Sequence, residues 1–239
     1  MKILAIDTSA VVATAAIVDE TKTIASCTAH NDKKHAQTIM PIIAQTLALA
    51  ELSLRDIDVF ACTDGPGSFT GLRIGAATVM GLARGCGKNI IPVPTLDALA
   101  YNAVLCCQSQ SQSLVIPMMD ARRGQVYAAF FAYDDDNGFE KQTEDFAADV
   151  NVVLTQAQET GKSVICLGDG AHAFREAILA FDFTMAPPHL NMQRAAAVGA
   201  LALLRQGTAV VPPDFKLRYL RMPQAERELC EREAGGLRP

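Results

Sequence analysis

Residues 64–85 read DGPGSFTGLRIGAATVMGLARG, a stretch with the apolar content of a helix and with glycine at positions 71, 75, 81 and 85. Each glycine inside a helix costs roughly 1 kcal/mol of stability relative to alanine. Glycine also lets another backbone come close, which can offset that cost. Because only Arg73 and Arg84 interrupt the apolar surface, we expect a helix over 70–85 that is covered on more than one side.

Two kinds of contact can explain these small side chains. The helix is either buried between two layers of its own lobe, or it packs with a second amphipathic helix at 38–51 against equivalent helices of another chain. The interface hypothesis involves Ile39, Met40, Ile43, Leu47, Phe69, Gly71, Leu72, Gly75, Ala76, Val79 and Ala83. Alternatively, the loop at 65–68 offers backbone N–H groups to a phosphate, although it lacks the lysine of a P-loop.

The composition limits which kinds of protein this chain can be. The chain has 239 residues, half of them apolar, which is enough for one large domain or two small lobes. A net charge of -5 argues against autonomous binding to nucleic acid or to an anionic membrane. The seven cysteines form no Cys-x-x-Cys pair, which favours buried thiols in a reducing cytosol. Since no apolar run reaches membrane-spanning length and Asp7 interrupts any signal-peptide core, we expect a cytoplasmic protein.

The two halves of the chain repeat one pattern. Each half contains, in order, an apolar run, an aspartate, a polar turn, an apolar strand and an acidic turn. The two stretches are KILAIDTSAVVATAAIVDETK at 2–22 and LVIPMMDARRGQVYAAFFAYDDDNG at 114–138. We therefore predict an α/β protein of two duplicated lobes, 1–104 and 105–239, with mixed sheets flanked by helices. The tail from Pro212 is Pro-rich and then charged, and we expect its end to be mobile.

Five motifs follow one another along nearly the whole chain: ILAIDTS (3–9), GPGSFTGLRIG (65–75), MDARRGQVY (119–127), GDGA (168–171) and YLRMPQAE (219–226). Together they resemble the bacterial TsaB family, also called YeaZ. The resemblance implies a two-lobed fold of the sugar kinase and actin type. It further implies a role in making threonylcarbamoyladenosine, the modified base beside the anticodon of tRNAs that read codons beginning with A.

In that system TsaD transfers the threonylcarbamoyl group, TsaE is an ATPase and TsaB supports TsaD. The resemblance therefore implies a non-catalytic scaffold that pairs with TsaD, works with TsaE and forms a homodimer when alone. We expect tRNA to be bound mainly by TsaD, because the basic segment KLRYLR at 216–221 is followed by alternating glutamates. No membrane contact is expected. Two alternatives stay open: an independent ATP-dependent enzyme of the sugar kinase type, and a peptidase that acts on TsaD.

The metal site of TsaD-type proteins offers a test of catalysis. Those proteins hold a metal with a His-x-x-x-His pair, and the corresponding positions here are Thr95 and Leu99. A leucine cannot ligate a metal. The histidines are spaced too irregularly to replace the pair: His30, His35, His172 and His189. No Ser-His-Asp or Cys-His spacing indicates nucleophilic catalysis either, so we expect no catalytic residue and no metal site.

The expected nucleotide site is the turn after the first strand together with a later glycine turn. Asp7, Thr8 and Ser9 occupy the place where sugar kinases and actin-like proteins grip phosphate, and Gly168 and Gly170 lie where such folds approach an adenosine. The simpler explanation is that Asp7 and Ser9 satisfy turn amides and that the glycines only turn the chain.

A second anion site is conceivable at Asp120, Arg122 and Arg123, unless these side chains merely pair with one another. We expect the chain to have no cofactor of its own. ATP or ADP is then expected only in the complex with TsaD and TsaE.

Overall fold

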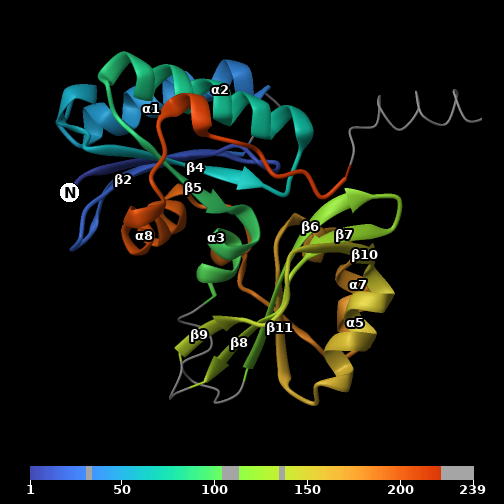
Figure 1. Ribbon diagram of the computed structural model, residues 1–239. Coiled ribbons are helices and arrows are strands. Elements are labelled where there is room, and N and C mark those ends of the chain that lie inside the picture. The colour runs from blue at the N-terminus through green and yellow to red at the C-terminus, as the bar shows by residue number, and fades with distance from the viewer. Residues whose placement is uncertain (31–33, 104–112, 135–137, 222–239) are drawn as a thin grey trace, which may run out of the picture.

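The chain folds into two lobes, each built on a mixed sheet (Figure 1). The computed structural model describes residues 1–30, 34–103, 113–134 and 138–221. The first lobe contains β1 (Ile3–Asp7), β2 (Ala13–Val18), β3 (Thr23–Ala29), α1 (His35–Leu49), η1 (Leu54–Asp56), β4 (Val59–Gly65), α2 (Phe69–Cys86) and β5 (Ile90–Pro94). None of the described helices is long and apolar enough to cross a membrane.

The rest of the chain enters the second lobe and then leaves it. The connecting helix and the second lobe consist of α3 (Thr95–Tyr101), β6 (Ser113–Arg122), β7 (Gln125–Ala128), β8 (Phe131–Asp134), β9 (Gly138–Lys141), β10 (Phe146–Asp149), α5 (Val150–Glu159), β11 (Ser163–Leu167), α6 (Asp169–Ala173), α7 (Arg175–Ala180) and β12 (Thr184–Met185). The final elements are η2 (Pro188–Leu190), α8 (Ala195–Leu204), η3 (Gln206–Thr208) and η4 (Pro212–Asp214).

The two sheets share one topology, which confirms the predicted duplication. The first sheet has the order β3-β2-β1-β4-β5, with β1 antiparallel to β2 and parallel to β4. The second has the order β10-β7-β6-β11-β12, with β6 antiparallel to β7 and parallel to β11. If β6 is matched to β1, the strands correspond one to one, and only β8 and β9 are additional.

Helices cover both faces of the first sheet, which explains why β1 is apolar at consecutive positions. Leu4 and Ile6 pack with α1 and α2 in one cluster, whereas Ile3 and Ala5 pack with α8 in another. Side chains alternate between the two faces of a strand. Every residue of β1 is therefore buried.

The segment after Ala195 returns to the first lobe, so the predicted second lobe of 105–239 is wrong for this part of the chain. Val198 and Ala202 of α8 pack with strands of the first sheet. Phe215 is only 6% exposed and lies in the cluster beneath α1 and α2. Residues 212–221 thus lie against the first lobe, and the end of the tail, which we expect to be mobile, lies outside the described residues.

Two of the glycines in α2 are explained by the chain itself. A β-carbon at Gly71 would lie 2.1 Å from the carbonyl oxygen of Thr8, and one at Gly75 would lie 2.6 Å from the Thr8 hydroxyl. The Thr8 hydroxyl also donates a hydrogen bond of 2.7 Å to the Gly71 carbonyl. A β-carbon at Gly81 or Gly85 would meet nothing within 4 Å. The first half of α2 is thus glycine-rich because it lies against the end of β1.

Most residues of the interface hypothesis lie in the chain's own core. Eight of them are buried there: Ile39, Ile43, Gly71, Leu72, Gly75, Ala76, Val79 and Ala83. Their faces of α1 and α2 meet the first sheet, so they contact this chain and not another one. Met40 differs because it is 48% exposed, while Leu47 and Phe69 are partly exposed.

We expect opposite effects of alanine at two glycines of the same helix. Gly71→Ala should lower the free energy of unfolding by about 1–3 kcal/mol, because the new methyl group collides with backbone. Gly81→Ala should raise it by up to about 1 kcal/mol, because the methyl group enters open space. Urea unfolding of both variants at low protein concentration measures the two changes. Equal effects would contradict the packing described here.

Candidate functional site

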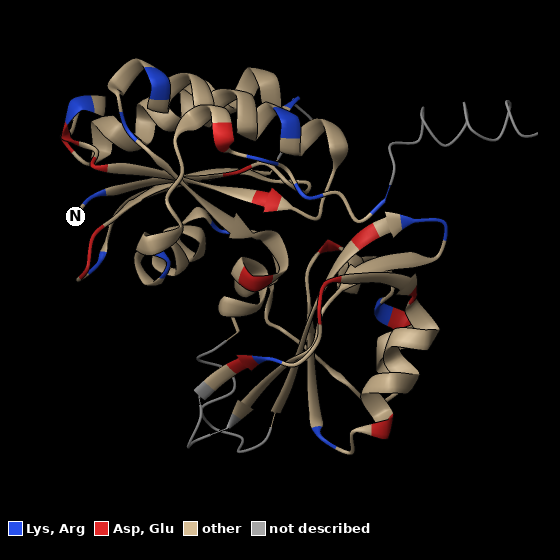
Figure 2. Ribbon diagram, in the orientation of Figure 1, with Lys and Arg blue, Asp and Glu red and all other residues tan. Residues whose placement is uncertain are grey.

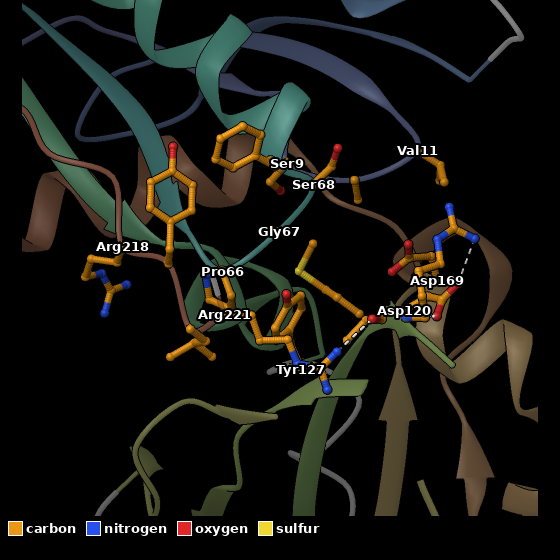
Figure 3. A pocket seen from close by; sticks show the side chains of 17 residues that line it. Ser9, Val11, Pro66, Gly67, Ser68, Asp120, Tyr127, Asp169, Arg218 and Arg221 are labelled. Atoms are coloured by element: carbon orange, nitrogen blue, oxygen red, sulfur yellow. Dashed lines mark hydrogen bonds and ion pairs between the residues drawn. The ribbon is translucent and has the colours of Figure 1, made fainter. Parts of the chain in front are cut away.

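A pocket of about 320 Å³ lies between the two lobes (Figure 3). The first lobe contributes the β1–β2 turn at 9–11 and the segment 66–69, which leads into α2. The second lobe contributes the β6–β7 turn around 119–122, with Tyr127 and Asp169. The C-terminal segment 218–221 completes the wall.

The duplication explains why these turns meet. Asp7 closes β1 and pairs with Thr14 of β2, while Asp120 lies near the end of β6 and pairs with Val126 of β7. The two equivalent hairpin turns thus face one another across the pocket. In the second turn, Arg122 donates its backbone N–H to Asp120 Oδ1 at 2.7 Å, and its guanidinium lies 3.1 Å from Asp120 Oδ2. Asp120 and Arg122 therefore do pair with one another.

Arg123 has the positive φ of 56° that this tight turn demands, and its side chain is exposed. Figure 3 shows Asp120 and Asp169 on one side of the pocket and Arg218 on the opposite side. Asp169 is buried, and this raises the pKa of its carboxyl, although backbone N–H groups of Asp120 and Gly170 act in the other direction. The second-lobe side of the pocket thus carries Asp120 and Asp169 together with Arg122, which is paired with Asp120.

The residues of the predicted phosphate site, at positions 7–9, form several hydrogen bonds within the chain. Asp7 is fully buried, and its Oδ1 accepts hydrogen bonds from the Ser9 amide at 2.7 Å and the Thr63 hydroxyl at 3.0 Å. Burial raises the pKa of Asp7 above its ordinary value, against the lowering effect of these bonds and of His35. The Thr8 hydroxyl is taken by Gly71. Within this turn, the described structure gives the buried Asp7 Oδ2 and Ser9 hydroxyl oxygen no hydrogen-bond partner.

The glycine turn that is predicted to lie beside an adenosine packs against β6 of the same chain. A β-carbon at Gly168 would lie 2.0 Å from the Met118 carbonyl oxygen, and one at Gly170 would lie 2.9 Å from the Met118 carbonyl carbon. The Gly168 amide donates to Asn191 Oδ1 at 2.7 Å. These glycines let α6 pack closely on β6. A nucleotide site at residues 7–9, 168 and 170 stays a prediction.

The segment 215–221, which we call the strap, contains the main residues of the candidate site that the sequence analysis did not predict. The Arg218 guanidinium donates to both carboxylate oxygens of Asp64, at 2.9 and 2.8 Å, and to the Gly65 carbonyl at 3.1 Å. Tyr219 packs on Phe69 with ring centroids 5.2 Å apart. The basic segment at 216–221 and the motif at 219–226 marked this region in the sequence, but neither indicated its partners.

Other reactive side chains are occupied or protected. Thr95 and Leu99 are fully buried in α3, and Leu99 belongs to the apolar cluster between the lobes. His35 Nε2 lies 2.7 Å from the Ala10 carbonyl oxygen. Burial raises the pKa of the Cys166 thiol to about 12, which keeps it protonated and poorly nucleophilic. Among the residues that the structure describes, no group of three or more His, Cys, Asp and Glu side chains could hold a metal ion.

Comparisons with known proteins agree with this fold. The family model described as TsaD, tRNA N6-adenosine threonylcarbamoyltransferase, matches residues 23–227. The chain is 32% identical over 182 residues to "tRNA threonylcarbamoyladenosine biosynthesis protein TsaB" of Bacillus subtilis, covering 74% of this chain and 75% of that protein. It is 30% identical over 177 residues to the protein of the same name from Escherichia coli, covering 73% and 74%.

A solved structure from Pseudomonas aeruginosa, described as an uncharacterized protein with similarity to peptidase YEAZ, matches with a TM-score of 0.75. It is 24% identical and covers 92% of this chain and 99% of its own. Topology and matches together define a two-lobed α/β protein related to the threonylcarbamoyltransferases. Within that class, the chain belongs to the TsaB family, also called YeaZ.

We expect Asp7→Asn to stabilise the fold in a pH-dependent way. The ionised carboxylate costs stability at neutral pH because burial holds the pKa of Asp7 above 3.8, and protonation removes that cost. The variant should therefore unfold at a higher temperature than the natural chain at neutral pH, and the difference should shrink as pH falls through the raised pKa towards 3.8. Thermal unfolding followed by circular dichroism measures this. An advantage that grows on acidification would contradict the burial argument.

Proposed function

We propose that this chain is a non-catalytic scaffold that supports TsaD in making threonylcarbamoyladenosine in tRNA, and that it binds TsaD through the outer face of α1 and α2. As a member of the TsaB family it takes part in that biosynthesis. The observation that carries the interface proposal is the composition of α1. Its fifteen residues, HAQTIMPIIAQTLAL, contain no Asp, Glu, Lys or Arg, although one side of the helix faces solvent.

The outer face of α1 is apolar and exposed. Met40 is 48% exposed, and Ala44 and Ala48 are exposed one turn and two turns further along. Surface helices normally carry charged side chains on their solvent side. The exposed side of α1 also carries Gln37 and Gln45 but no charge, and an uncharged surface with exposed apolar residues is typical of an interaction site.

The neighbouring helix extends this surface. Ala77, Gly81 and Gly85 are exposed on α2, and added β-carbons at Gly81 and Gly85 would enter open space. In Figure 2, both helices lie on the same face of the first sheet and carry few charges. Small residues on a helix surface let a second helix approach closely. The two glycines that the chain's own packing does not explain therefore support a partner helix.

TsaD is the partner that we propose, with a second copy of this chain taking its place in a homodimer. The family model named TsaD matches residues 23–227, so TsaD-type proteins share the region that contains α1 and α2. Two related helix pairs can pack face to face by the same surface, as in an isologous dimer. We propose that TsaE joins this complex and that tRNA is bound mainly by TsaD, since this chain has a net charge of -5.

We propose a non-catalytic role because the side chains at the candidate nucleotide and metal positions form contacts within the chain. Asp7 and Thr8 are engaged within the fold, and Leu99 packs in the apolar cluster where TsaD-type proteins place a metal ligand. The strap residue Arg218 forms part of the pocket wall. We propose that ATP or ADP acts in the complex with TsaD and TsaE and that this chain has no cofactor of its own. The chain is proposed to act in the cytoplasm, where tRNA is modified.

We expect Ala44→Glu and Gly81→Glu each to weaken binding to TsaD by roughly a hundredfold or more, because a carboxylate would be buried without a partner. Both positions are exposed in the isolated chain, so the fold should be retained. Light scattering behind gel filtration, with and without TsaD, measures the masses. Formation of the modified base with TsaD, TsaE and unmodified tRNA should fall in parallel.

Thr155→Glu is the matched control, because Thr155 is exposed on α5 of the other lobe. It should leave both the complex and the modification unchanged. Full TsaD binding by the Ala44 and Gly81 variants would refute the interface proposal. Full modification without any added copy of this chain would refute the scaffold role.

Calorimetry with the purified chain tests the enzyme alternative. We expect no heat of binding on titration with ATP and Mg²⁺, because the predicted nucleotide residues are engaged within the fold. Turnover of ATP by the chain alone, abolished in Asp7→Ala, would support the kinase-like enzyme instead. Cleavage of TsaD on long incubation with the chain would support the peptidase.

A further inference from the structure

Among the described residues, the two lobes touch in several places, and two of these contacts differ in kind. At the base, Leu96 and Leu99 of α3 pack with Val115 and Phe131 of the second lobe in a fully buried apolar cluster. At the mouth of the pocket, the strap runs from the first lobe to the tip of the β6–β7 hairpin (Figure 1). The base is a permanent core contact. The mouth is held by polar and aromatic contacts of a single segment.

The strap is fixed to the first lobe along most of its length. Phe215 is inserted into the core beneath α2. The Arg218 amide donates to the Asp64 carbonyl at 2.7 Å, and its guanidinium binds the Asp64 carboxylate. Tyr219 packs on Phe69, and Arg73 lies 3.8 Å above the same ring. The first part of the strap therefore cannot leave without exposing an aromatic cluster and a buried carboxylate.

The same segment reaches the second lobe with two arginines. Arg218 Nη1 lies 3.7 Å from Asp145 Oδ2, and the Asp145 side chain is only 5% exposed. Arg221 donates to the Ala121 carbonyl at 3.0 Å, and its guanidinium lies 5.7 Å from the centre of the Tyr127 ring. Both contacts join the strap to the second lobe, and Arg218, Arg221 and Tyr127 line the pocket.

Arg218 stands between carboxylates of opposite lobes. Asp64 lies at the end of β4, and Asp145 lies between β9 and β10. Lys141 forms ion pairs with Asp145 and with Asp97 of α3. Arg205 forms a further ion pair with Asp97. Without Arg218, Asp64 would have no cation within salt-bridge distance among the described residues. Two mostly buried carboxylates would then face one another across the mouth and repel.

We propose that the strap is a built-in clasp: residues 215–221 occupy the mouth of the interlobe cleft and hold the two lobes closed, with Arg218 as the cation that lets Asp64 and Asp145 lie close together. Closure of the lobes then requires no bound small molecule. The clasp contacts α2 in its first turns, at Phe69 and Arg73, whereas the TsaD proposal is tested at Ala44 and Gly81, so separate variants test the two proposals.

Arg218→Gln in the full chain is the direct test. We expect the variant to open at the mouth, so that its radius of gyration increases in small-angle X-ray scattering coupled to gel filtration. Gel filtration separates a change of shape from a change of oligomeric state. Hydrogen exchange of the strap amides should accelerate roughly tenfold, because their local opening becomes easier.

The double variant Asp64→Asn with Arg218→Gln separates repulsion from simple fraying. It removes the uncompensated charge, so the radius of gyration should return towards that of the natural chain while the strap amides still exchange fast. Arg221→Ala, which removes only the contacts at Ala121 and Tyr127, should open the mouth more weakly. It serves as the test if Arg218→Gln fails to fold.

Arg55→Gln is the matched control, because Arg55 is exposed in η1 and is remote from the strap in sequence. It should change neither measurement. Fast strap exchange in Arg218→Gln with an unchanged radius of gyration would show that the strap frays without holding the lobes, and this would overturn the proposal. No change in either measurement would overturn it as well.

Discussion

The contact between the first turn of α2 and the end of β1 is the constraint on which the rest of the structure depends. Gly71 and Gly75 let the helix backbone lie directly on Thr8, whose hydroxyl is bonded to the Gly71 carbonyl. This contact fixes the height and rotation of α2 over the sheet. It therefore places the loop at 66–69 in the wall of the interlobe pocket. It also turns Ala77 and Gly81 outward, where a partner can reach them.

The same contact explains why the turn after β1 is a structural element in this chain. A hydroxyl that is bonded to a helix carbonyl is not free for a ligand, and a carboxylate that holds the Ser9 amide and the Thr63 hydroxyl is already in use. Burial of that carboxylate is unfavourable in its charged form. The Thr8 hydroxyl and Asp7 Oδ1 thus serve the packing of α2 and the shape of the turn.

The sequence predicted the duplicated fold well because the signals are local. The repeated order of apolar run, aspartate and turn is visible within twenty-odd residues, and the common strand order of the two sheets confirms it. The direction of helix faces was harder to predict. An apolar stripe such as Ile39, Ile43, Val79 and Ala83 shows that something covers it, but periodicity does not say whether the cover is the chain's own sheet or another subunit.

The strap could not be predicted because its contacts are distant in sequence. Arg218 and Asp64 are separated by 154 residues, so the segment 216–221 has the pattern of a solvated, charged tail when it is considered alone. Similarly, the buried position of α8 beside β1 depends on a return of the chain after the whole second lobe. Local patterns therefore locate strands and helices, whereas the segments that tie the two lobes together are defined only by tertiary contacts.

The separation of these roles in space has a consequence for assembly. The exposed apolar face belongs entirely to α1 and α2 of the first lobe, while the clasp and the pocket lie between the lobes. A partner that binds the helix face therefore needs no particular angle between the lobes in order to dock. If the clasp keeps that angle fixed, the second lobe is held at a constant position relative to the docked partner. A scaffold gains from this arrangement, because rigidity that is already present in the free chain need not be established, at an entropic cost, when the complex forms.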